Sequence, residues 1–345
     1  MKDNIKLSII ELNKIQIPLV LDIKGSDKWV RYGTDNLFPR FLWENYLLNS
    51  NLQAIINTMA DYIGGEGIVC SDIINKDGET FNEVIKRCIV DYLIFGGFCV
   101  EVIRNKERGI AEIYYQDIQN VRLNEAETKA YLSSDWSSWK LTPVTLSLNP
   151  NNLHFLYYVK NPVTRGIYPI PIYQGALKSI LILNSTRDFH LNNLQNNFTG
   201  NSIINFNNGV PSEDVQEEIE RKIRDKFSGS NNAGKFILSF NDNKDSAVTI
   251  ERLESDNFGE LYQSLQDSSK KDIFTAFRIA PILVGVNPEN NGFSKAEYLE
   301  AFTLYNRTVI KPIQDVIRGA FMKIGLDISF IPFKLEEEVQ KTEQL

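Results

Sequence analysis

An uninterrupted helical pattern, ALKSILILNSTRDFHLNNLQNNF at residues 176–198, sets the architecture of the chain because it contains neither glycine nor proline. Its apolar residues recur at helical spacing at Leu177, Leu181, Leu194 and Phe198. We therefore predict a long helix over residues 175–198. Asparagine is a poor helix former, yet the second half of this helix contains Asn192, Asn193, Asn196 and Asn197. Something other than helix propensity must select amides there.

A small insert and a second long helix follow. We predict the insert over residues 199–256, built from the strand NSIINF, a turn at Asn208-Gly209, a helix opened by Pro211-Ser212-Glu213-Asp214, and the strands KFILSF and AVTIERL. The chain then returns to a helix over residues 257–278, which Pro281 ends. The apolar residues of this second helix again recur at helical spacing, at Phe258, Leu261, Leu265, Ile273, Phe274 and Phe277.

A polar loop, GVNPENNG at residues 285–292, leads to the last helix. Ser294-Lys295-Ala296-Glu297 has the form of a capping box, so we predict this helix over residues 294–325, with a kink at Pro312. Residues 326–345 form a charged C-terminal tail. The order helix, insert, helix, loop, helix indicates part of an assembly rather than an active site.

The first half of the chain, residues 1–174, predicts an α+β domain. One helix over Leu37–Ile63 stops at a cluster of glycines, and a second over Glu79–Leu93 ends at Gly96-Gly97. Five later segments alternate apolar with polar residues between turns: FCVEVIRN, GIAEIYYQ, NVRLN, AYLSS and HFLYYVKNP. This alternation predicts one antiparallel meander over about residues 98–160.

Composition excludes several classes of function. A net charge of −7 opposes tight wrapping of nucleic acid, which needs a basic face. Three widely spaced cysteines argue against a disulfide framework and predict folding in a reducing, cytosolic environment. With only two histidines we expect no metal site, and we expect no cofactor. The longest apolar run, residues 167–183, is broken by prolines and polar residues, so we expect a soluble chain without a membrane partner.

The segment GSNNAGKF at residues 229–236 matches a phosphate-binding P-loop up to its last position. A serine or threonine must bind magnesium there, and Phe236 cannot. A P-loop also follows a strand and opens a helix, whereas here a helix precedes and a strand follows. His154 and His190 lack a neighbouring serine or cysteine motif, and carboxylate pairs such as Glu217-Glu218 are ordinary on an acidic surface. We therefore expect no enzyme, although a P-loop-like nucleotide hydrolase remains one alternative.

Five short motifs follow one another along the chain: Leu37-Phe38-Pro39, Gly209-Val210-Pro211-Ser212-Glu213, Gly234-Lys235, Pro281-Ile282-Leu283-Val284-Gly285 and Lys311-Pro312. In this order they resemble the pattern of the portal protein family of tailed bacteriophages. The resemblance spans nearly the whole chain. Its weight lies in the order and spacing of the motifs, because no single motif is specific. Another component of the phage head-tail connector with a similar α+β plan is the remaining alternative.

The resemblance implies a wing at residues 1–174, stem helices at 175–198 and 257–278, a clip at 199–256, a tunnel-loop region at 279–293 and a kinked wing helix at 294–325. With only the tail at 326–345 left, it implies little or no crown. The DNA-facing tunnel loop would comprise Val286, Asn287, Pro288, Glu289, Asn290, Asn291 and Gly292. The candidate channel residues of the stem are the four asparagines named above, with Lys270 and Lys271.

The resemblance also implies partners and a location. Portal subunits form a homo-oligomeric ring of about a dozen copies at one capsid vertex, with heterologous contacts. The ring contacts the major capsid protein and scaffold, docks the terminase large subunit and the head-tail adaptor, and passes double-stranded DNA during packaging and ejection. The resemblance therefore places the chain in the virion, after assembly in the cytoplasm of the host bacterium.

The charge pattern of the predicted loop suits a DNA conduit. A dense field of lysine and arginine would hold phosphates and retain DNA, whereas Asn287, Asn290 and Asn291 offer neutral contacts. The same residues are also ordinary turn formers between two helices, so both interpretations remain open at this level.

Overall fold

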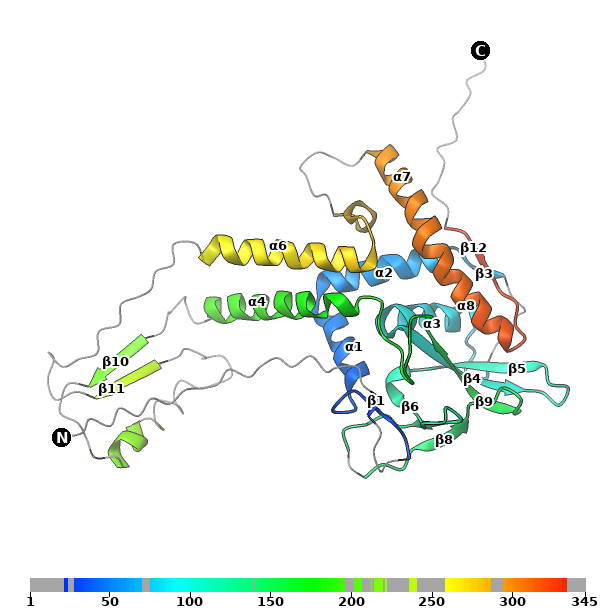
Figure 1. Ribbon diagram of the computed structural model, residues 1–345, viewed down its shortest axis with the longest axis horizontal. Coiled ribbons are helices and arrows are strands. Elements are labelled where there is room, and N and C mark those ends of the chain that lie inside the picture. Colours follow the sequence, from blue (N-terminus) through cyan, green and yellow to red (C-terminus); the bar gives the residue numbers. More distant parts are fainter. Residues whose placement is uncertain are drawn as a thin grey trace, which may run out of the picture. The chain divides into compact units, whose positions relative to one another are not determined.

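The computed structural model describes residues 22–23, 28–69, 75–138, 140–195, 202–206, 212, 214–219, 221, 236–240, 258–286 and 294–333 (Figure 1). The chain divides into two units. Unit 1 contains residues 1–178 and 272–345, and unit 2 contains residues 179–271. The predicted mixture of helices with antiparallel strands is confirmed.

The prediction of one helix over Leu37–Ile63 was wrong, because two helices occupy this segment. Helix α1 (Phe38–Leu48) ends at Asn49, and α2 (Ser50–Gly64) begins directly after it. The Asn49 side chain accepts a hydrogen bond from the Leu52 backbone N–H at 3.1 Å, and its backbone is extended. Periodicity continues across this single non-helical residue, which is why the break was missed. The predicted stop is confirmed, since Gly65 follows the last residue of α2.

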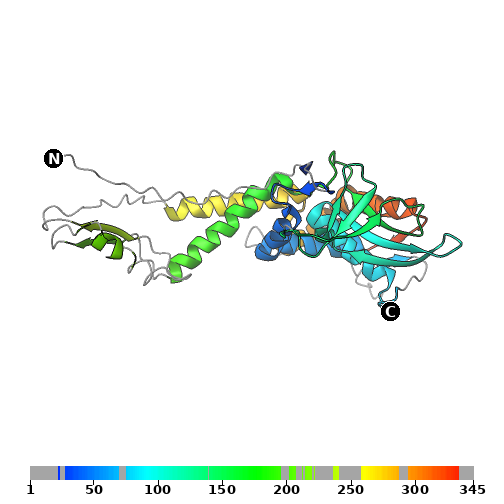
Figure 2. The same ribbon diagram turned by 90° about the horizontal axis from the view of Figure 1, so that it is seen from below.

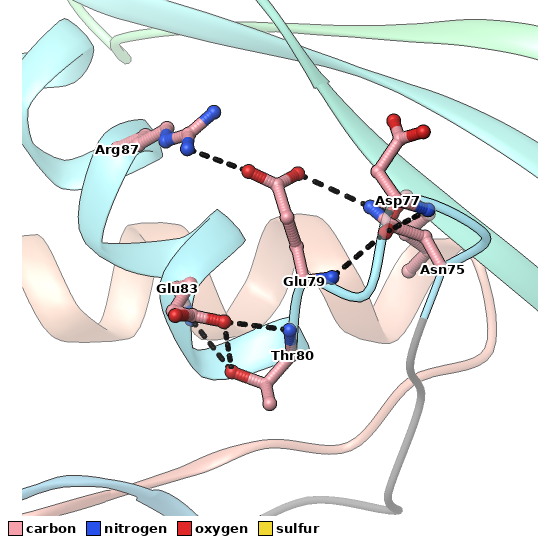
Figure 3. A network of polar contacts seen from close by, with 7 residues as sticks. Asn75, Asp77, Glu79, Thr80, Glu83 and Arg87 are labelled. Carbon is pink, nitrogen blue, oxygen red and sulfur yellow. Dashed lines mark hydrogen bonds and ion pairs between the residues drawn. The ribbon is translucent and has the colours of Figure 1, made fainter.

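Helix α3 (Phe81–Phe95) begins at a polar network, which Figure 3 shows. Thr80 and Glu83 form a reciprocal capping box, which satisfies two backbone N–H groups of the first turn. The Asn75 side chain accepts from the Glu79 backbone N–H and donates to the Ile113 carbonyl of β5 (Ile110–Gln116). Arg87 lies 2.5 Å from a Glu79 carboxylate oxygen. The turn before α3 is thereby attached both to the helix and to the sheet.

The strands between residues 97 and 160 form two three-stranded sheets rather than the single meander that was predicted. In the first sheet the order is β5-β4-β9, all antiparallel, with β4 (Gly97–Arg104) between β5 and β9 (His154–Lys160). In the second sheet the order is β6-β7-β8, with β6 (Val121–Leu123), β7 (Lys129–Leu132) and β8 (Val144–Ser147). Alternation identified the strands, but it carries no information on which strands pair.

A short turn sends the chain from the first sheet into the second. The Asp117 carboxylate accepts from the Gln119 backbone N–H at 2.8 Å and starts the 3₁₀ helix η1 (Ile118–Asn120) directly after β5. Strand β9 then returns to the other edge of β4. The return requires glycine at Gly97, because a Cβ there would lie 2.4 Å from the Val159 carbonyl oxygen.

The core of unit 1 lies between α3 and the first sheet. Helix α3 packs on β4 and β5, α2 packs on α3, and α1 contacts both helices (Figure 1). The side chains of this layer are fully or almost fully buried, among them Ile56, Met59, Ile85, Ile89, Leu93, Phe98, Val100, Val102 and Phe155. Each such aliphatic or aromatic side chain contributes about 1.5–3 kcal/mol of transfer free energy.

The last helical segment has three consecutive parts: α7 (Lys295–Tyr305), the π-helical η5 (Asn306–Ile310) and α8 (Lys311–Lys323). Pro312, the predicted kink, is the second residue of α8. The Lys311 backbone N–H bonds to the Asn306 carbonyl, so the π turn lies directly before the proline, which has no N–H to donate.

Part of the predicted C-terminal tail belongs to the fold. Strand β12 (Ser329–Ile331) pairs antiparallel with β3 (Gly67–Val69), and Ile328 is fully buried. Phe330 and Ile331 lie in this strand. The charged segment after residue 333 lies outside the described residues.

Unit 2 contains most of helices α4 (Leu177–Gln195) and α6 (Phe258–Phe277) and a parallel strand pair. Strand β10 (Ser202–Phe206) runs parallel to β11 (Phe236–Phe240), side by side in Figure 2. Residues 214–219 and 221 are helical, as predicted after Pro211. The predicted turn at Asn208-Gly209 and the strand AVTIERL lie outside the described residues.

A buried arginine joins β6 to the turn before α1. Arg122 is 1% exposed and donates to the Asn36 side-chain and backbone oxygens and to the carbonyls of Gln119 and Val121. Its guanidinium lies 4.9 Å from the centre of the Trp136 ring. Burial lowers the pKa of Arg122 to about 10. The short strands β1 (Asp22–Ile23) and β2 (Arg31–Tyr32) pair close to this turn.

We predict that Arg122→Met lowers the free energy of unfolding by roughly 3 kcal/mol, because it leaves several buried oxygen atoms without a donor. Urea denaturation of the two proteins measures the loss. Arg318→Met is the matched control, since Arg318 forms only an exposed ion pair with Asp327 and its removal should cost less than about 1 kcal/mol. Equal losses in the two variants would contradict the role assigned to Arg122.

A second buried charge gives a pH-dependent prediction. Asp91 is 4% exposed, and both carboxylate oxygens accept from the Tyr115 hydroxyl at 3.0 Å. Burial, with the nearby Asp117 carboxylate, raises the pKa of Asp91 well above its ordinary value. The folded state therefore binds this proton more tightly than the unfolded state. The ionised form costs stability at neutral pH, and that cost fades as pH falls towards about 4.

We expect Asp91→Asn, which cannot ionise, to gain in free energy of unfolding relative to wild type as pH rises from about 4 to 8. Denaturation curves recorded across this range measure the difference. Asp77→Asn is the control, because Asp77 is exposed and its substitution should leave the difference flat. A flat difference for Asp91→Asn as well would show that its burial has no electrostatic cost.

Candidate functional site

The predicted tunnel loop lies between two described anchor points. Of its residues only Val286 is described, and Asn287, Pro288, Glu289, Asn290, Asn291 and Gly292 lie outside the described residues. The loop leaves the fold after the 3₁₀ helix η4 (Pro281–Val284) and re-enters at Ser294, directly before α7. The structure therefore describes the residues at both ends of the loop.

The first anchor is a tight turn. Gly285 adopts a left-handed backbone with φ of 78°, which ends η4, and its N–H bonds to the Ile282 carbonyl at 3.2 Å. The Val286 N–H bonds to the Pro281 carbonyl at 3.0 Å. The Leu283 side chain, inside η4, is only 3% exposed. These contacts fix the direction in which the chain enters the loop.

The second anchor is the first turn of α7. The Ser294 hydroxyl accepts from the Glu297 N–H at 3.5 Å, as the capping pattern predicted. Two aromatic residues of this helix face the fold. Phe302 lies 5.1 Å from the Tyr62 ring, and the Tyr305 hydroxyl donates to the Phe277 carbonyl at 3.3 Å.

Tyr62 of α2 connects the two anchors. Its hydroxyl donates to the Leu283 carbonyl at 2.9 Å and lies 2.8 Å from the Tyr298 hydroxyl, which therefore donates to it. Burial raises the pKa of Tyr62 well above the ordinary tyrosine value, so the group is neutral at physiological pH. Sequence reasoning missed this residue. The signal was its position between Met59 and Ile63 on the apolar side of α2, where a tyrosine needs a polar partner.

The stem candidates lie on two helices of unit 2. Asn192 and Asn193 belong to the last turns of α4, and Asn196 and Asn197 lie outside the described residues. Phe189 of α4 stacks on Tyr262 of α6 with ring centres 5.6 Å apart, and His190 lies edge-on to the same ring at 5.9 Å. An aromatic contact therefore joins the two helices.

Charges of both signs alternate along the described part of α6. Lys270 is half-buried and lies 3.5 Å from Asp267, and Lys271 is exposed next to Asp272. Two bases and two acids thus follow one another within six residues of sequence. The described side chains of α6 form no continuous basic strip of the kind that holds phosphates.

The described residues provide little chemistry for catalysis. Within the described ranges no group of three or more His, Cys, Asp and Glu could hold a metal ion. Cys88 and Cys99 are buried free thiols, and burial raises the pKa of each well above its usual value, which disfavours the reactive thiolate. His154 lies 2.5 Å from Glu101 and is half exposed.

Two further expectations concern the P-loop-like segment and membranes. The segment at 229–235 lies outside the described residues, but β11 begins at Phe236 directly after it, as predicted for a loop that leads into a strand. No helix in the described part of the chain is long and apolar enough to cross a membrane.

Comparison with known protein families identifies the family to which this chain belongs. The model of the family described as phage portal protein matches residues 73–340. This chain belongs to the phage portal protein family. The match covers both stem candidates, the loop with its two anchors and the final helix, and the resemblance seen in the sequence is confirmed.

Solved structures share the portal fold at low sequence identity. A chain of the virion of a native gene transfer agent particle matches with a TM-score of 0.55 and 14% identity, covering 84% of this chain and 83% of that one. A chain from the neck of a native gene transfer agent particle, computed with C12 symmetry, matches with a TM-score of 0.53, 13% identity and 84% of each chain. An HK97 family phage portal protein from Corynebacterium diphtheriae gives 0.51 at 12% identity, covering 84% of this chain and 94% of that one.

A relative in sequence is an uncharacterized protein of Rickettsia bellii (strain RML369-C). It is 30% identical over 119 residues, which are 34% of this chain. The alignment spans 29% of the length of that relative.

We predict that Tyr62→Phe in this portal-family chain loosens both loop anchors, because the Leu283 carbonyl and the Tyr298 hydroxyl each lose a buried partner. The expected loss in free energy of unfolding is about 1–3 kcal/mol. Backbone hydrogen exchange should accelerate at residues 283–286 and 294–298. Tyr92→Phe is the control, as a buried tyrosine of α3. Unchanged exchange at either anchor would contradict the linking role of Tyr62.

Proposed function

We propose that this chain is the subunit of a portal ring that conducts double-stranded DNA at the unique vertex of a phage capsid. The family match over residues 73–340 carries the proposal, because it covers the helix, insert, helix, loop, helix unit as a whole. The ring contains about a dozen copies of the chain. A chain of similar fold in a neck computed with C12 symmetry supports this number.

The proposed channel surface consists of the tunnel loop, Val286 to Gly292, and the amide-rich ends of the stem helices. DNA must slide past this surface, so its contacts with phosphates must be numerous enough to guide and weak enough to release. The amides of Asn287, Asn290 and Asn291 meet this requirement, and the alternating charges of α6 are compatible with it. The two anchors that Tyr62 joins would hold the loop in place during translocation.

The proposed partners follow from the position of such a ring. The wing would contact the major capsid protein and scaffold, and the clip would dock the terminase large subunit and later the head-tail adaptor. The ring itself is not an enzyme, since the terminase supplies the motive force. It would be assembled in the cytoplasm of the host bacterium and remain in the virion through DNA ejection.

The test is to assemble the purified chain and to measure its contact with DNA. Negative-stain images should show closed rings. Replacing Asn287, Asn290 and Asn291 by lysine should leave the rings intact but retain threaded DNA at low salt, with release as salt rises, because each lysine adds phosphate contacts in every subunit. The same positions changed to glutamine are the matched control and should behave like wild type.

Two results would count against the proposal. A wild-type chain that stays monomeric under all assembly conditions would rule out the proposed ring. Rings whose DNA retention is the same with lysine as with glutamine would show that the loop does not face DNA.

A further inference from the structure

Two helices of unit 1 expose a pair of large apolar side chains each. Leu47 and Leu48 end α1, with 53% and 69% of their surface exposed, and Leu299 and Leu304 lie on α7, with 39% and 65% exposed. Elsewhere in the described part of unit 1 the large exposed apolar residues stand singly along the sequence. Scattered exposed residues of this type are normal, but two large ones close together on one helix indicate an interaction surface.

The α7 pair lines a hollow of 390 Å³ on the helix surface. Four of its five lining residues are Glu300, Thr303 and Leu304 of α7 and Arg307 of η5, which are separated in sequence as i, i+3, i+4 and i+7. In a regular α-helix this spacing forms the hole that accepts one side chain of a neighbouring helix in knobs-into-holes packing. We name these four residues and Leu299 the α7 hole.

The middle of the α7 hole is apolar and its ends carry opposite charges. The Thr303 hydroxyl donates to the Leu299 carbonyl at 2.7 Å, so the hydroxyl is satisfied within the helix. The Arg307 side chain makes no hydrogen bond or ion pair with any residue in the described ranges, and neither does the Glu300 side chain. A partner therefore needs an apolar knob and an acid one helical turn away from it.

The exposed face of α1 has this composition. Arg40, Glu44, Leu47 and Leu48 follow the spacing i, i+4, i+7 and i+8, so they share one side of the helix. Arg40 and Glu44 form an exposed ion pair at 2.8 Å. With the helices antiparallel, a leucine knob from α1 in the α7 hole brings Glu44, one turn earlier, opposite Arg307. The parallel arrangement would instead bring Glu44 towards Glu300.

We propose that the α7 hole of one subunit receives Leu48 of α1 from a second copy of this chain, with Leu47 beside it. The inference rests on the proposed ring and names one of its contacts. A ring closes through heterologous contacts, in which two different patches of the same chain meet. The α1 face and the α7 hole are two such patches, complementary in shape and in charge.

The first experiment compares three substitutions in the full chain by sedimentation velocity and negative stain. Leu304→Glu and Leu48→Glu should each weaken ring assembly by at least about tenfold, because a charge enters an apolar contact at its centre. Met322→Glu is the matched control. Met322 lies on α8, is 53% exposed and lies outside the hole, so its ring should form as in wild type.

Mixing the two deficient variants tests the pairing itself. Leu304→Glu keeps the α1 face and Leu48→Glu keeps the α7 hole, so the mixture has one intact contact per pair and should give one-to-one dimers. Each variant alone should remain monomeric. Circular dichroism confirms that both variants are folded, as expected for changes at exposed sites.

The outcomes separate this inference from the proposed function. Rings in both leucine variants, or a mixture that stays monomeric, would overturn the α7–α1 contact and leave the proposed ring standing. A wild-type chain without rings would overturn the proposed function. A second experiment reverses the charges. Arg307→Glu alone should weaken ring assembly, and the double variant with Glu44→Arg should restore it. Failure of the second change to restore assembly would overturn the assigned antiparallel register.

Discussion

The hydroxyl group of Tyr62 joins the two described ends of the predicted tunnel loop. It accepts from Tyr298 and donates to the Leu283 carbonyl, so one buried atom joins the end of η4 to the start of α7. A loop closed between two fixed points loses less entropy on ordering than one with free ends. Because a buried phenol without partners would cost free energy, the two anchors and α2 must stay together.

Two buried charged side chains of unit 1 also join elements that are distant in sequence. Arg122 donates to four oxygen atoms, and both carboxylate oxygens of Asp91 accept from the Tyr115 hydroxyl. Neither adds much net stability, since burying a charge offsets most of what its hydrogen bonds contribute. Their effect is on geometry. Arg122 holds the turn before α1, and Asp91 attaches α3 to β5. Arg122 thus positions the start of α1, and Asp91 positions α3, on which α2 with Tyr62 packs.

The sequence predicted local structure well and pairing poorly, for physical reasons. Helices α3, α4 and α6 and the cap at Ser294 were expected, because periodicity, glycines and capping residues act within a few positions. The break at Asn49 escaped notice because the apolar periodicity continues across this single non-helical residue. The division into two sheets depends on β9 returning to β4, and β12 depends on β3, far away in sequence. Tyr62 was missed for the same reason, since its partners come 221 and 236 residues later. The roles of Asn287, Asn290 and Asn291 stay predictions.

The final helix shows how a proline is accommodated inside a long helix. Pro312 has no N–H, so an α-helical turn would leave the Thr308 carbonyl without its usual partner. The π turn over Asn306–Ile310 shifts the pairing at this place, with the Lys311 N–H on the Asn306 carbonyl. The helical halves on either side of this turn are both attached to α2. Tyr298 of α7 donates to the Tyr62 hydroxyl, and Gln314 of α8 donates to the Ile63 carbonyl. Tyr305 also donates to the Phe277 carbonyl, and Phe321 stacks on Phe98. The π turn therefore lets the chain pass Pro312 while both halves keep their contacts with neighbouring residues of the same helix.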